Sequence, residues 1–385
     1  LMIASFMAAG TVPTVLVVGL KSINPSIFLT VAFILCCITS LITGTSWGTI
    51  GTVGVAMIGV GAGLGADPAI TAGAIVSGAY FGDKMSPLSD STILASTMTG
   101  TELWTHIKNM LWTTLPGAIL CLILYTVLGF SGASDSYDTS AIDSIISAMN
   151  DIYHIDFLAV LPLLVVMVLI ALRASTVGSL LIGTVLGSVI AVVYQGYSPK
   201  EMAAFLYSGF VVNSEDSFLT GILNRGGLTS MMSLVAMIIV ALGLGGIISE
   251  TGLLKPVFEA ITRSIRSAKG VLLMAWVIVW MCVCIVPTYN FAFVLVPTLF
   301  NPLMKRYHLK TENLSRILED VGTLGGNLFP WCVGPVFASG VLGISTAQYW
   351  PYVFLSILVP IISLIFIFLG FKTKFEDGYK QEAAN

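Results

Sequence analysis

The sequence predicts an all-α protein that crosses a lipid bilayer several times. Hydrophobic residues make up 56% of its 385 residues and charged residues only 10%, whereas an ordinary soluble domain carries about 25% charged residues. The apolar residues also gather in runs of about the length that spans a bilayer. A net charge of −3 without a basic face argues against nucleic acid as a partner. We therefore expect the lipid bilayer to be the main partner.

Spanning helices are predicted where about 20 consecutive residues are mainly apolar. The clearest runs are 26–43, 107–130, 157–172, 175–194, 228–249, 270–286 and 349–371. Residues 1–20 are apolar too but begin without a charged leader, so we expect a missing native start rather than a signal peptide. Residues 48–66 and 291–304 are expected to be spans broken by glycine or proline. Residues 69–100 and 313–343 are apolar but rich in polar residues and helix breakers.

The placement of lysine and arginine predicts the topology, because cytoplasmic loops are enriched in both. Basic residues cluster in 255–269, 305–310 and 372–380, which we place in the cytoplasm. The stretch between Lys108 and Arg173 has neither lysine nor arginine and is placed outside. Residues 197–227 carry both signs and are expected to form a long external loop with a short amphipathic piece.

A weak repeat appears when the chain is shifted by 243 residues. The matched pairs are Pro13 with Pro256, Thr45 with Thr288, Gly82 with Gly325, Pro87 with Pro330, Ser96 with Ser339 and Gly100 with Gly343. The loop after the first broken span is uncharged as far as Asp67, whereas its counterpart holds Lys305 and Arg306. Matching loops on opposite sides of the membrane are typical of inverted-topology repeats in secondary transporters. The alternative is a chance alignment of glycine and proline in a glycine-rich chain.

This repeat divides the chain into three parts. We expect 1–130 to be the first inverted repeat, with its N-terminus truncated, and 131–227 to hold an external loop, linking helices and an external segment. Residues 228–385 are expected to be the second repeat and a cytoplasmic tail. Each repeat is predicted to contain broken helices.

The densest polar segment at membrane depth runs from Gly82 to Thr92. Ser86 followed by Pro87 is a helix-start pattern, which predicts a break near 83–86 and a restart at Pro87. A break frees backbone groups and is tolerated in a membrane only where protein or water replaces the lost hydrogen bonds. We therefore expect a cavity onto which four side chains converge, namely Asp83, Ser86, Ser89 and Asp90.

Carboxylate and hydroxyl oxygens suit a hard cation, and a carboxylate also binds a proton. A carboxylate that binds either sodium or a proton makes the two ions compete, which is the minimum requirement for exchange. We expect Asp90 and Ser86 to be the sodium ligands. One interpretation of Lys84 is that it pairs with Asp83 and neutralises it, which leaves Asp90 as the titrating group. The alternative is that Asp90 only compensates a helix dipole.

A second polar cluster lies between Leu314 and Trp331. Glu319 and Asp320 are adjacent, so on a helix their side chains diverge by about 100°. We expect one to pair with Arg316 and the other to face the cavity, and we choose Asp320 for the site together with Thr323 and Asn327. The alternative is a solvated helix start that carries surface charges.

A third polar element is the alternation of hydroxyl residues and glycines at 43–49, which supplies Thr45 and Ser46 as candidates. Its counterpart in the second half, 287–290, adds Asn290. The alternative is that small residues here only allow helices to pack closely.

Enzymes and metal centres fit the sequence poorly. The six cysteines lie inside apolar runs and the three histidines do not cluster, so we expect no metal cofactor. A hydrolase needs a nucleophile beside a base, and the serine-rich stretch 86–97 has no nearby histidine in the sequence. We therefore predict no enzymatic activity, and sodium only as a transported or coupling ion.

At these motifs the sequence resembles the NhaC-type sodium/proton antiporters, a family that includes malate/lactate antiporters. The resemblance rests on Gly-Thr-Ser-Trp-Gly-Thr at 44–49, Gly-Asp-Lys-Met-Ser-Pro-Leu-Ser-Asp at 82–90 and Leu-Ser-Arg-x-Leu-Glu-Asp-x-Gly-Thr at 314–323. It implies a multi-pass exchanger of the bacterial or archaeal cytoplasmic membrane within the ion-transporter superfamily, with two re-entrant hairpins and an expected homodimer. The second-half motif departs from the family at 288–291 and at Cys332.

We therefore predict an antiporter that exchanges sodium for protons by alternating access. The alternative is a sodium- and proton-coupled exchanger of small organic anions, of the malate/lactate type, or of amino acids. Helix N-termini near Pro87 and Pro330 would favour carboxylate groups in the cavity.

Overall fold

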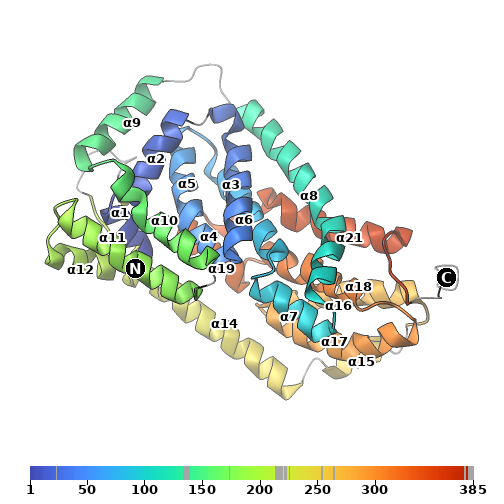
Figure 1. The fold of residues 1–385 in the computed structure, drawn as a ribbon. Coiled ribbons are helices and arrows are strands. Elements are labelled where there is room, and N and C mark those ends of the chain that lie inside the picture. The colour runs from blue at the N-terminus through green and yellow to red at the C-terminus, as the bar shows by residue number, and fades with distance from the viewer. Residues whose placement is uncertain are drawn as a thin grey trace.

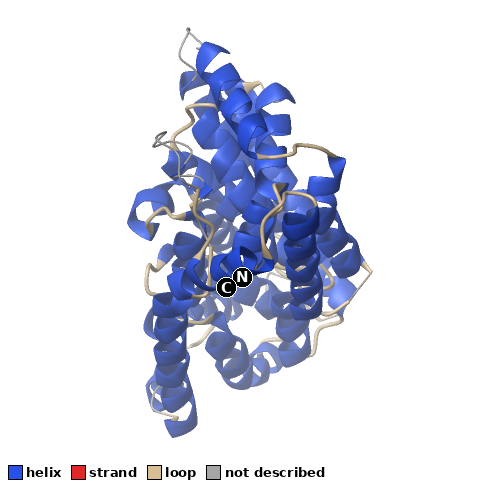
Figure 2. Cartoon of the chain, turned by 90° about the vertical axis from the view of Figure 1, so that its left-hand side faces the viewer, coloured by secondary structure: helices blue, strands red, loops and turns tan. Residues whose placement is uncertain are grey.

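The computed structural model describes residues 1–22, 24–132, 139–172, 174–212, 220, 223–224, 226–252, 255–262, 265–376 and 379. In this part of the chain the regular structure is helical, apart from an isolated antiparallel bridge between Leu309 and Phe375. Figure 2 accordingly shows helices joined by loops. The all-α prediction is confirmed for the described residues.

The helices follow one another with short connections (Figure 1). Those of the first part are α1 (Met2–Ala8), α2 (Thr11–Ser22), η1 (Pro25–Ile27), α3 (Phe28–Thr43), α4 (Ser46–Thr49), η2 (Ile50–Gly54), α5 (Val55–Gly63), α6 (Pro68–Met85), α7 (Asp90–Thr99) and α8 (Leu103–Gly132). The middle part holds α9 (Thr139–Ile152), α10 (Phe157–Ala171), α11 (Thr176–Val193) and α12 (Pro199–Ser208).

The last part of the chain begins with η3 (Thr229–Met231) and the long α14 (Met232–Thr251), which runs along the lower edge of the molecule in Figure 1. The elements that follow are α15 (Lys255–Thr262), α16 (Ala268–Ile285), α17 (Tyr289–Arg306), α18 (Glu312–Ile317), η4 (Leu318–Thr323), η5 (Gly325–Leu328), α19 (Val333–Leu342), α20 (Thr346–Tyr349), η6 (Trp350–Tyr352) and α21 (Phe354–Leu369).

Four helical stretches in the described residues are long and apolar enough to cross a bilayer, and three further pairs of helices pass the same test if each bent pair is one span. The four are Pro25–Thr43, Ser46–Gly63, Leu103–Ser131 and Ala268–Ile285. The bent pairs turn by 66°, 88° and 51° at their breaks. By length and composition, the chain is therefore a multi-pass membrane protein.

The expectation that 48–66 and 291–304 are broken spans is wrong. The first run stays helical as far as Gly63, and two of its glycines, Gly51 and Gly54, lie in the wider π-helical turn η2. The second is the continuous helix α17, with Pro297 and Pro302 inside it. Packed neighbours and local changes of helical turn can satisfy the backbone groups that a proline or glycine frees at membrane depth, so breaker residues alone do not end a buried helix.

The predicted external part, 131–227, is largely helical where it is described. α12 begins with a capping box formed by Ser198 and Glu201 and corresponds to the short amphipathic piece. Residues 133–138, 173, 213–219, 221–222 and 225 lie outside the described residues. The assignment of this part to the external side stays a prediction.

Two glycines bring α6 against α3 and so set the position of the first polar segment. A Cβ at Gly78 would lie 2.4 Å from the Phe33 carbonyl oxygen, and a Cβ at Gly82 would lie 2.3 Å from the Leu41 backbone nitrogen. Only residues without a side chain allow two backbones to approach this closely. Asp83 follows the second glycine, so its carboxylate is held at this close crossing.

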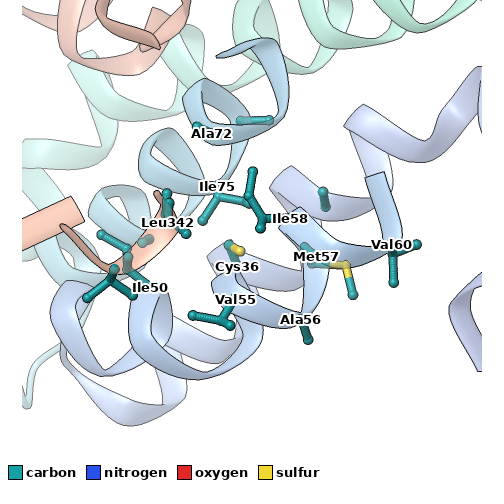
Figure 3. Close-up of a cluster of buried hydrophobic side chains, with 14 of the residues drawn as sticks. Cys36, Ile50, Val55, Ala56, Met57, Ile58, Val60, Ala72, Ile75 and Leu342 are labelled. Carbon is teal, nitrogen blue, oxygen red and sulfur yellow. The ribbon is translucent and has the colours of Figure 1, made fainter. Parts of the chain in front are cut away.

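An apolar core supports the crossing from one side. Figure 3 shows buried side chains of α3, η2, α5 and α6 packed together, among them Cys36, Ile50, Met57 and Ile75. Leu342 of α19 joins the same cluster although it lies far away in the sequence. The core therefore connects the first part of the chain with α19, the helix that follows the second polar cluster.

The chain between α6 and α7 breaks where the sequence predicts, but it restarts at Asp90 rather than at Pro87. Ser86 and Ser89 are both extended, and Pro87 lies in the turn between them. The Ser86 hydroxyl accepts a hydrogen bond from the Leu88 backbone amide at 3.3 Å. It therefore stabilises the turn instead of capping a helix that starts at the proline.

Candidate ion-binding site

Asp83, in the last turn of α6, accepts hydrogen bonds on both carboxylate oxygens. The Ser46 hydroxyl donates to Oδ2 at 2.7 Å and the Ser89 hydroxyl donates to Oδ1 at 2.6 Å. Ser89 Oγ also lies 3.1 Å from Ser91 Oγ. Four oxygen-bearing side chains thus gather at the point where α4, the end of α6 and the start of α7 meet. We call Ser46, Asp83, Ser89 and Ser91 the hydroxyl–carboxylate cluster.

Local sequence explains why α4 presents its serine here. Thr45 is extended and its side chain accepts a hydrogen bond from the Gly48 amide at 3.3 Å, so it caps the start of α4. Gly44 adopts a left-handed conformation (φ 68°) that ends α3, which glycine takes without steric cost. The chain turns sharply between the two helices, and Ser46 is directed at Asp83.

A cavity of about 540 Å³ opens beside this cluster. Asp90 is exposed in it, and Thr45 contributes a further oxygen to its lining. Its aromatic lining residues are Trp47, Tyr80, Tyr289 and Phe337, and Trp47 stacks on Phe337 with ring centroids 4.5 Å apart. Five of the predicted site residues therefore share one cavity, namely Asp83, Asp90, Ser89, Thr45 and Ser46.

The predicted residues of the second half surround a neighbouring cavity of about 340 Å³. Asn290, Thr323 and Asn327 line it, and the Asn327 amide also donates to Ser356 Oγ at 3.1 Å. Three aromatic side chains line both cavities, namely Trp47, Tyr80 and Tyr289. The candidate residues from the two halves therefore line neighbouring cavities that share these three aromatic side chains. The sequence did not predict any of the three as a site residue.

Two predicted site residues lie outside the linings of both cavities. Ser86 is buried and supports the turn described above. Asp320 is fully buried and forms an ion pair with Lys84, and the Thr113 hydroxyl donates to the same carboxylate oxygen at 2.9 Å. A cation that reaches these two residues would have to pass beyond the cavities as they stand.

The predicted pairing of Lys84 with Asp83 is wrong. The two residues are adjacent on α6, so their side chains point in different directions. Asp83 faces the hydroxyl groups, whereas Lys84 reaches Asp320 in η4. The pair is fully buried and joins segments 236 residues apart in the sequence, so the charge of Lys84 is matched by the second half of the chain.

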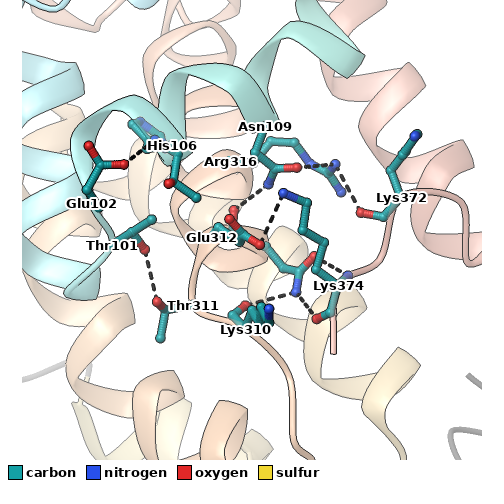
Figure 4. A network of polar contacts seen from close by, with 12 residues as sticks. Thr101, Glu102, His106, Asn109, Lys310, Thr311, Glu312, Arg316, Lys372 and Lys374 are labelled. Atoms are coloured by element: carbon teal, nitrogen blue, oxygen red, sulfur yellow. Dashed lines mark hydrogen bonds and ion pairs between the residues drawn. The ribbon is translucent and has the colours of Figure 1, made fainter. Parts of the chain in front are cut away.

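The predicted pairing of Arg316 with one of the two acidic residues that follow it is also wrong. Its guanidinium donates to the Asn109 side chain at 3.4 Å and to the Lys372 carbonyl at 3.5 Å (Figure 4). Arg316 therefore faces α8 and the C-terminal segment. Glu319 is left fully buried, with no hydrogen-bond partner for either carboxylate oxygen among the described residues.

The contacts of Figure 4 form a separate polar network away from the cavities. The Asn109 amide donates to the Glu312 carbonyl at 2.7 Å, and the Glu312 carboxylate pairs with Lys374 at 3.1 Å. Thr101 and Thr311 hydroxyls lie 3.0 Å apart. These contacts hold the starts of α8 and α18 together and join them to the C-terminal segment. The turn η4 follows α18 directly.

The described residues contain no group of three or more histidine, cysteine or acidic side chains that could hold a metal ion. The six cysteines are free, five of them buried. Any cation at this site would therefore rely on one or two carboxylates with hydroxyl and carbonyl oxygens, which is the donor set that a weakly held hard ion needs rather than a resident transition metal.

The sequence of this chain matches a model of the Na+/H+ antiporter family over residues 78–371. It is 37% identical over 369 residues to the malate-2H(+)/Na(+)-lactate antiporter of Bacillus subtilis, covering 96% of this chain and 79% of that protein. It is 37% identical over 387 residues to the Na(+)/H(+) antiporter NhaC of Alkalihalophilus pseudofirmus, covering 100% and 82%. It is 31% identical over 379 residues to the arginine/ornithine antiporter ArcD of Halobacterium salinarum, covering 98% and 78%.

Proposed function

The chain belongs to the Na+/H+ antiporter family, and from this premise we propose that it exchanges sodium for protons across the cytoplasmic membrane of a bacterium or archaeon. The observation that carries the proposal is the hydroxyl–carboxylate cluster, in which Ser46 and Ser89 hold the Asp83 carboxylate beside a cavity. Sodium is a hard cation and binds to oxygen ligands of this kind.

Competition between the two ions follows from the chemistry of the carboxylates. A proton on Asp83 or Asp90 removes the charge that attracts sodium, so each ion displaces the other. Asp83 is held by two hydroxyl groups and is the proposed centre of the sodium site. Asp90 is exposed to the larger cavity and is the proposed group through which protons from water compete.

Alternating access is proposed to arise from two inverted repeats, each with a re-entrant hairpin at its break. The support is that elements 243 residues apart have the same bounds: α7 (Asp90–Thr99) matches α19 (Val333–Leu342), and the run Ser46–Gly63 matches α17 (Tyr289–Arg306). Thr45 and Thr288 both cap the helix that follows. Gly100 and Gly343 both end a helix in the left-handed conformation.

The direct test uses the purified chain in proteoliposomes with the sodium and pH gradients set separately. A pH gradient alone should drive sodium against its own gradient, and a sodium gradient should move protons in the opposite direction. Liposomes without protein provide the control. Sodium movement that ignores the pH gradient would contradict the proposal.

A second candidate function, exchange of small organic anions, is favoured by one feature of the cavities. The helices α4, α17 and α19 begin at the cavity linings, near Ser46, Tyr289 and Val333, and helix N-termini favour negative groups. Against it, Asp83 and Asp90 line the larger cavity, and no lysine, arginine or histidine is among the described residues that line either cavity. Malate or lactate added opposite to sodium should increase sodium flux if this candidate is correct, and leave it unchanged if not.

A further inference from the structure

The first half of α8 and the end of α21 expose a group of large apolar side chains. Trp112 of α8 and Phe368, Leu369 and Phe371 at the end of α21 are between 45% and 71% exposed. Trp112 and Phe371 contact edge to face, with ring centroids 6.4 Å apart. Exposed aromatic rings at the end of a spanning helix are typical of the boundary between lipid tails and head groups.

Two lysine side chains lie over these rings. The ammonium nitrogen of Lys372 is 3.7 Å from the centroid of the Trp112 ring and 5.7 Å from that of Phe371. The ammonium nitrogen of Lys269, near the start of α16, is 5.3 Å from the centroid of the Phe368 ring and donates to the Phe368 carbonyl at 2.8 Å. We call Trp112, Lys269, Phe368, Phe371 and Lys372 the basic–aromatic patch.

The ammonium groups of this patch keep hydrogen-bond donors for a ligand. Figure 4 shows the Lys372 side chain pointing away from the polar network, while its backbone carbonyl accepts from Arg316. Lys269 is exposed, and its ammonium group carries three donors, of which the Phe368 carbonyl takes one. Both lysines can therefore hydrogen-bond to an anion without giving up their contacts with the rings.

The helices of the patch do not compensate the charge of the two lysines. α8, α16 and α21 contain no aspartate or glutamate. The acidic residues of adjoining segments have partners of their own: Glu102 accepts from two backbone amides at the start of α8, Glu312 pairs with Lys374, and Glu376 lies 3.2 Å from His308. The described residues thus leave the negative counter-charge to a bound molecule.

The surroundings of the patch favour a phospholipid over a free anion. The exposed face of α21 continues from Phe368 to Ile365 and Ile361 at helical spacing, and it offers apolar surface for acyl chains. Lys269 and Lys372 also belong to two of the basic segments that predict the cytoplasmic side, where membranes carry anionic head groups. A phosphate with acyl chains matches both the charge and the apolar surface, whereas free phosphate matches only the charge.

The patch is connected to the second polar cluster through α8 and the C-terminal segment. The Lys372 carbonyl accepts from Arg316 at 3.5 Å. Thr113, the residue after Trp112, donates to Asp320 at 2.9 Å. A ligand that holds Lys372 against Trp112 therefore also holds together the two segments that contact Arg316 and Asp320.

We propose that the basic–aromatic patch binds the phosphate group of an anionic phospholipid, and that the bound lipid stabilises the fold at the end of α21. The ammonium groups of Lys269 and Lys372 donate to phosphate oxygens, and the acyl chains lie on the exposed face of α21. Phosphatidylglycerol fits the patch because its head group is negative. Phosphatidylcholine fits less well because its own ammonium group neutralises the phosphate. This site is separate from both cavities and does not depend on the proposed exchange of sodium for protons.

The test measures the unfolding temperature of the purified chain in detergent, with phosphatidylglycerol or phosphatidylcholine added at the same concentration. A ligand that binds only the folded state raises this temperature, so phosphatidylglycerol should raise that of the wild type about 2–4 °C more than phosphatidylcholine does. A variant carrying both Lys269→Gln and Lys372→Gln should lose this difference. Lys200→Gln, which removes an exposed lysine of α12 outside the patch, should keep it.

Two further variants separate loss of charge from damage to the fold. A variant with Lys269→Arg and Lys372→Arg keeps both charges and should keep the difference between the two lipids. If the double glutamine variant does not fold, Lys372→Gln alone decides, and it should reduce the difference.

Three outcomes would overturn the inference. The two lipids stabilise the wild type equally, the glutamine variants keep the full difference, or inorganic phosphate without lipid stabilises the wild type as much as phosphatidylglycerol does. The last outcome would assign the patch to a free anion instead of a lipid. Because the measurement is an unfolding temperature, it stands whether or not the chain exchanges sodium for protons.

Discussion

Asp83, just before the break between α6 and α7, and Glu319, in the π-helical turn η4, are two buried carboxylates with different surroundings. Asp83 accepts a hydrogen bond on each oxygen from a serine hydroxyl and lines a cavity. Glu319 has no hydrogen-bond partner among the described residues and lines neither cavity. Hydrogen bonds to a carboxylate stabilise its charged form, whereas burial alone favours the neutral form. Among the described residues, the same kind of group therefore meets two hydroxyl donors at Asp83 and none within hydrogen-bond distance at Glu319.

The ion pair between Lys84 and Asp320 lies between these two carboxylates, and breaking it should have the largest effect. Lys84→Met leaves the Asp320 charge buried without its partner, which typically costs about 3–5 kcal/mol of stability. We expect a strongly lowered unfolding temperature in detergent. Adding Asp320→Asn to the same chain should restore part of the loss, because the unpaired charge is removed. If Lys84→Met unfolds at the same temperature as the wild type, the ion pair does not stabilise the fold.

Removing the charge of the first carboxylate should have the next largest effect. Asp83→Asn keeps the size of the side chain but loses the negative charge, so its neutral amide oxygen attracts sodium less strongly than the carboxylate does. Loss of a charge-assisted contact of about 3 kcal/mol corresponds to about a hundredfold weaker sodium binding. Sodium uptake at varied sodium concentration measures it.

The matched control for this variant is Asp67→Asn at the other end of α6. Asp67 caps that helix by accepting from the Ala69 and Ile70 amides, and asparagine caps a helix about as well. The control should transport like the wild type. Equal sodium affinity in Asp83→Asn and in the control would remove Asp83 from the sodium site.

The exposed carboxylate at the cavity should show a smaller effect. Asp90→Asn is expected to weaken sodium binding about tenfold, or about 1.4 kcal/mol, because the exposed Asp90 carboxylate lies in the cavity lining, whereas the Asp83 carboxylate is buried and exposed charges interact more weakly. Sodium uptake measured at varied sodium concentration tests this expectation. A sodium affinity equal to that of the wild type would remove Asp90 from the sodium site.

Much of the fold follows from local sequence. The apolar runs predict the multi-pass helical architecture, and the segment from Gly82 to Thr92 predicts a break that the structure contains. The helix restarts at Asp90, three residues later than predicted. The reason is that Ser89 is extended and donates its hydroxyl to Asp83, so the turn around Pro87 includes Ser89. Breaks expected from glycine and proline in two other spans are absent, because the first span widens into a π-helical turn and α17 continues through both of its prolines.

The candidate site was predicted in part. Thr45, Ser46, Asp83, Ser89 and Asp90 were expected from two separate arguments, and they share one cavity. Lys84, Thr113 and Glu319 were not chosen. A signal was present, because charged residues inside apolar runs are usually functional, but sequence spacing suggested the wrong partners for them.

The sequence by itself determined that this chain is a multi-pass helical protein, that it breaks near residues 83–86 and which polar side chains stand near that break. Those properties depend on composition and on neighbours within a few residues. Only the tertiary structure decided which carboxylate receives hydroxyl groups, which receives a lysine and which receives neither. The physical reason is distance along the chain: Ser46 reaches Asp83 over 37 residues and Lys84 reaches Asp320 over 236, and no local pattern can specify contacts that form only when packed helices cross.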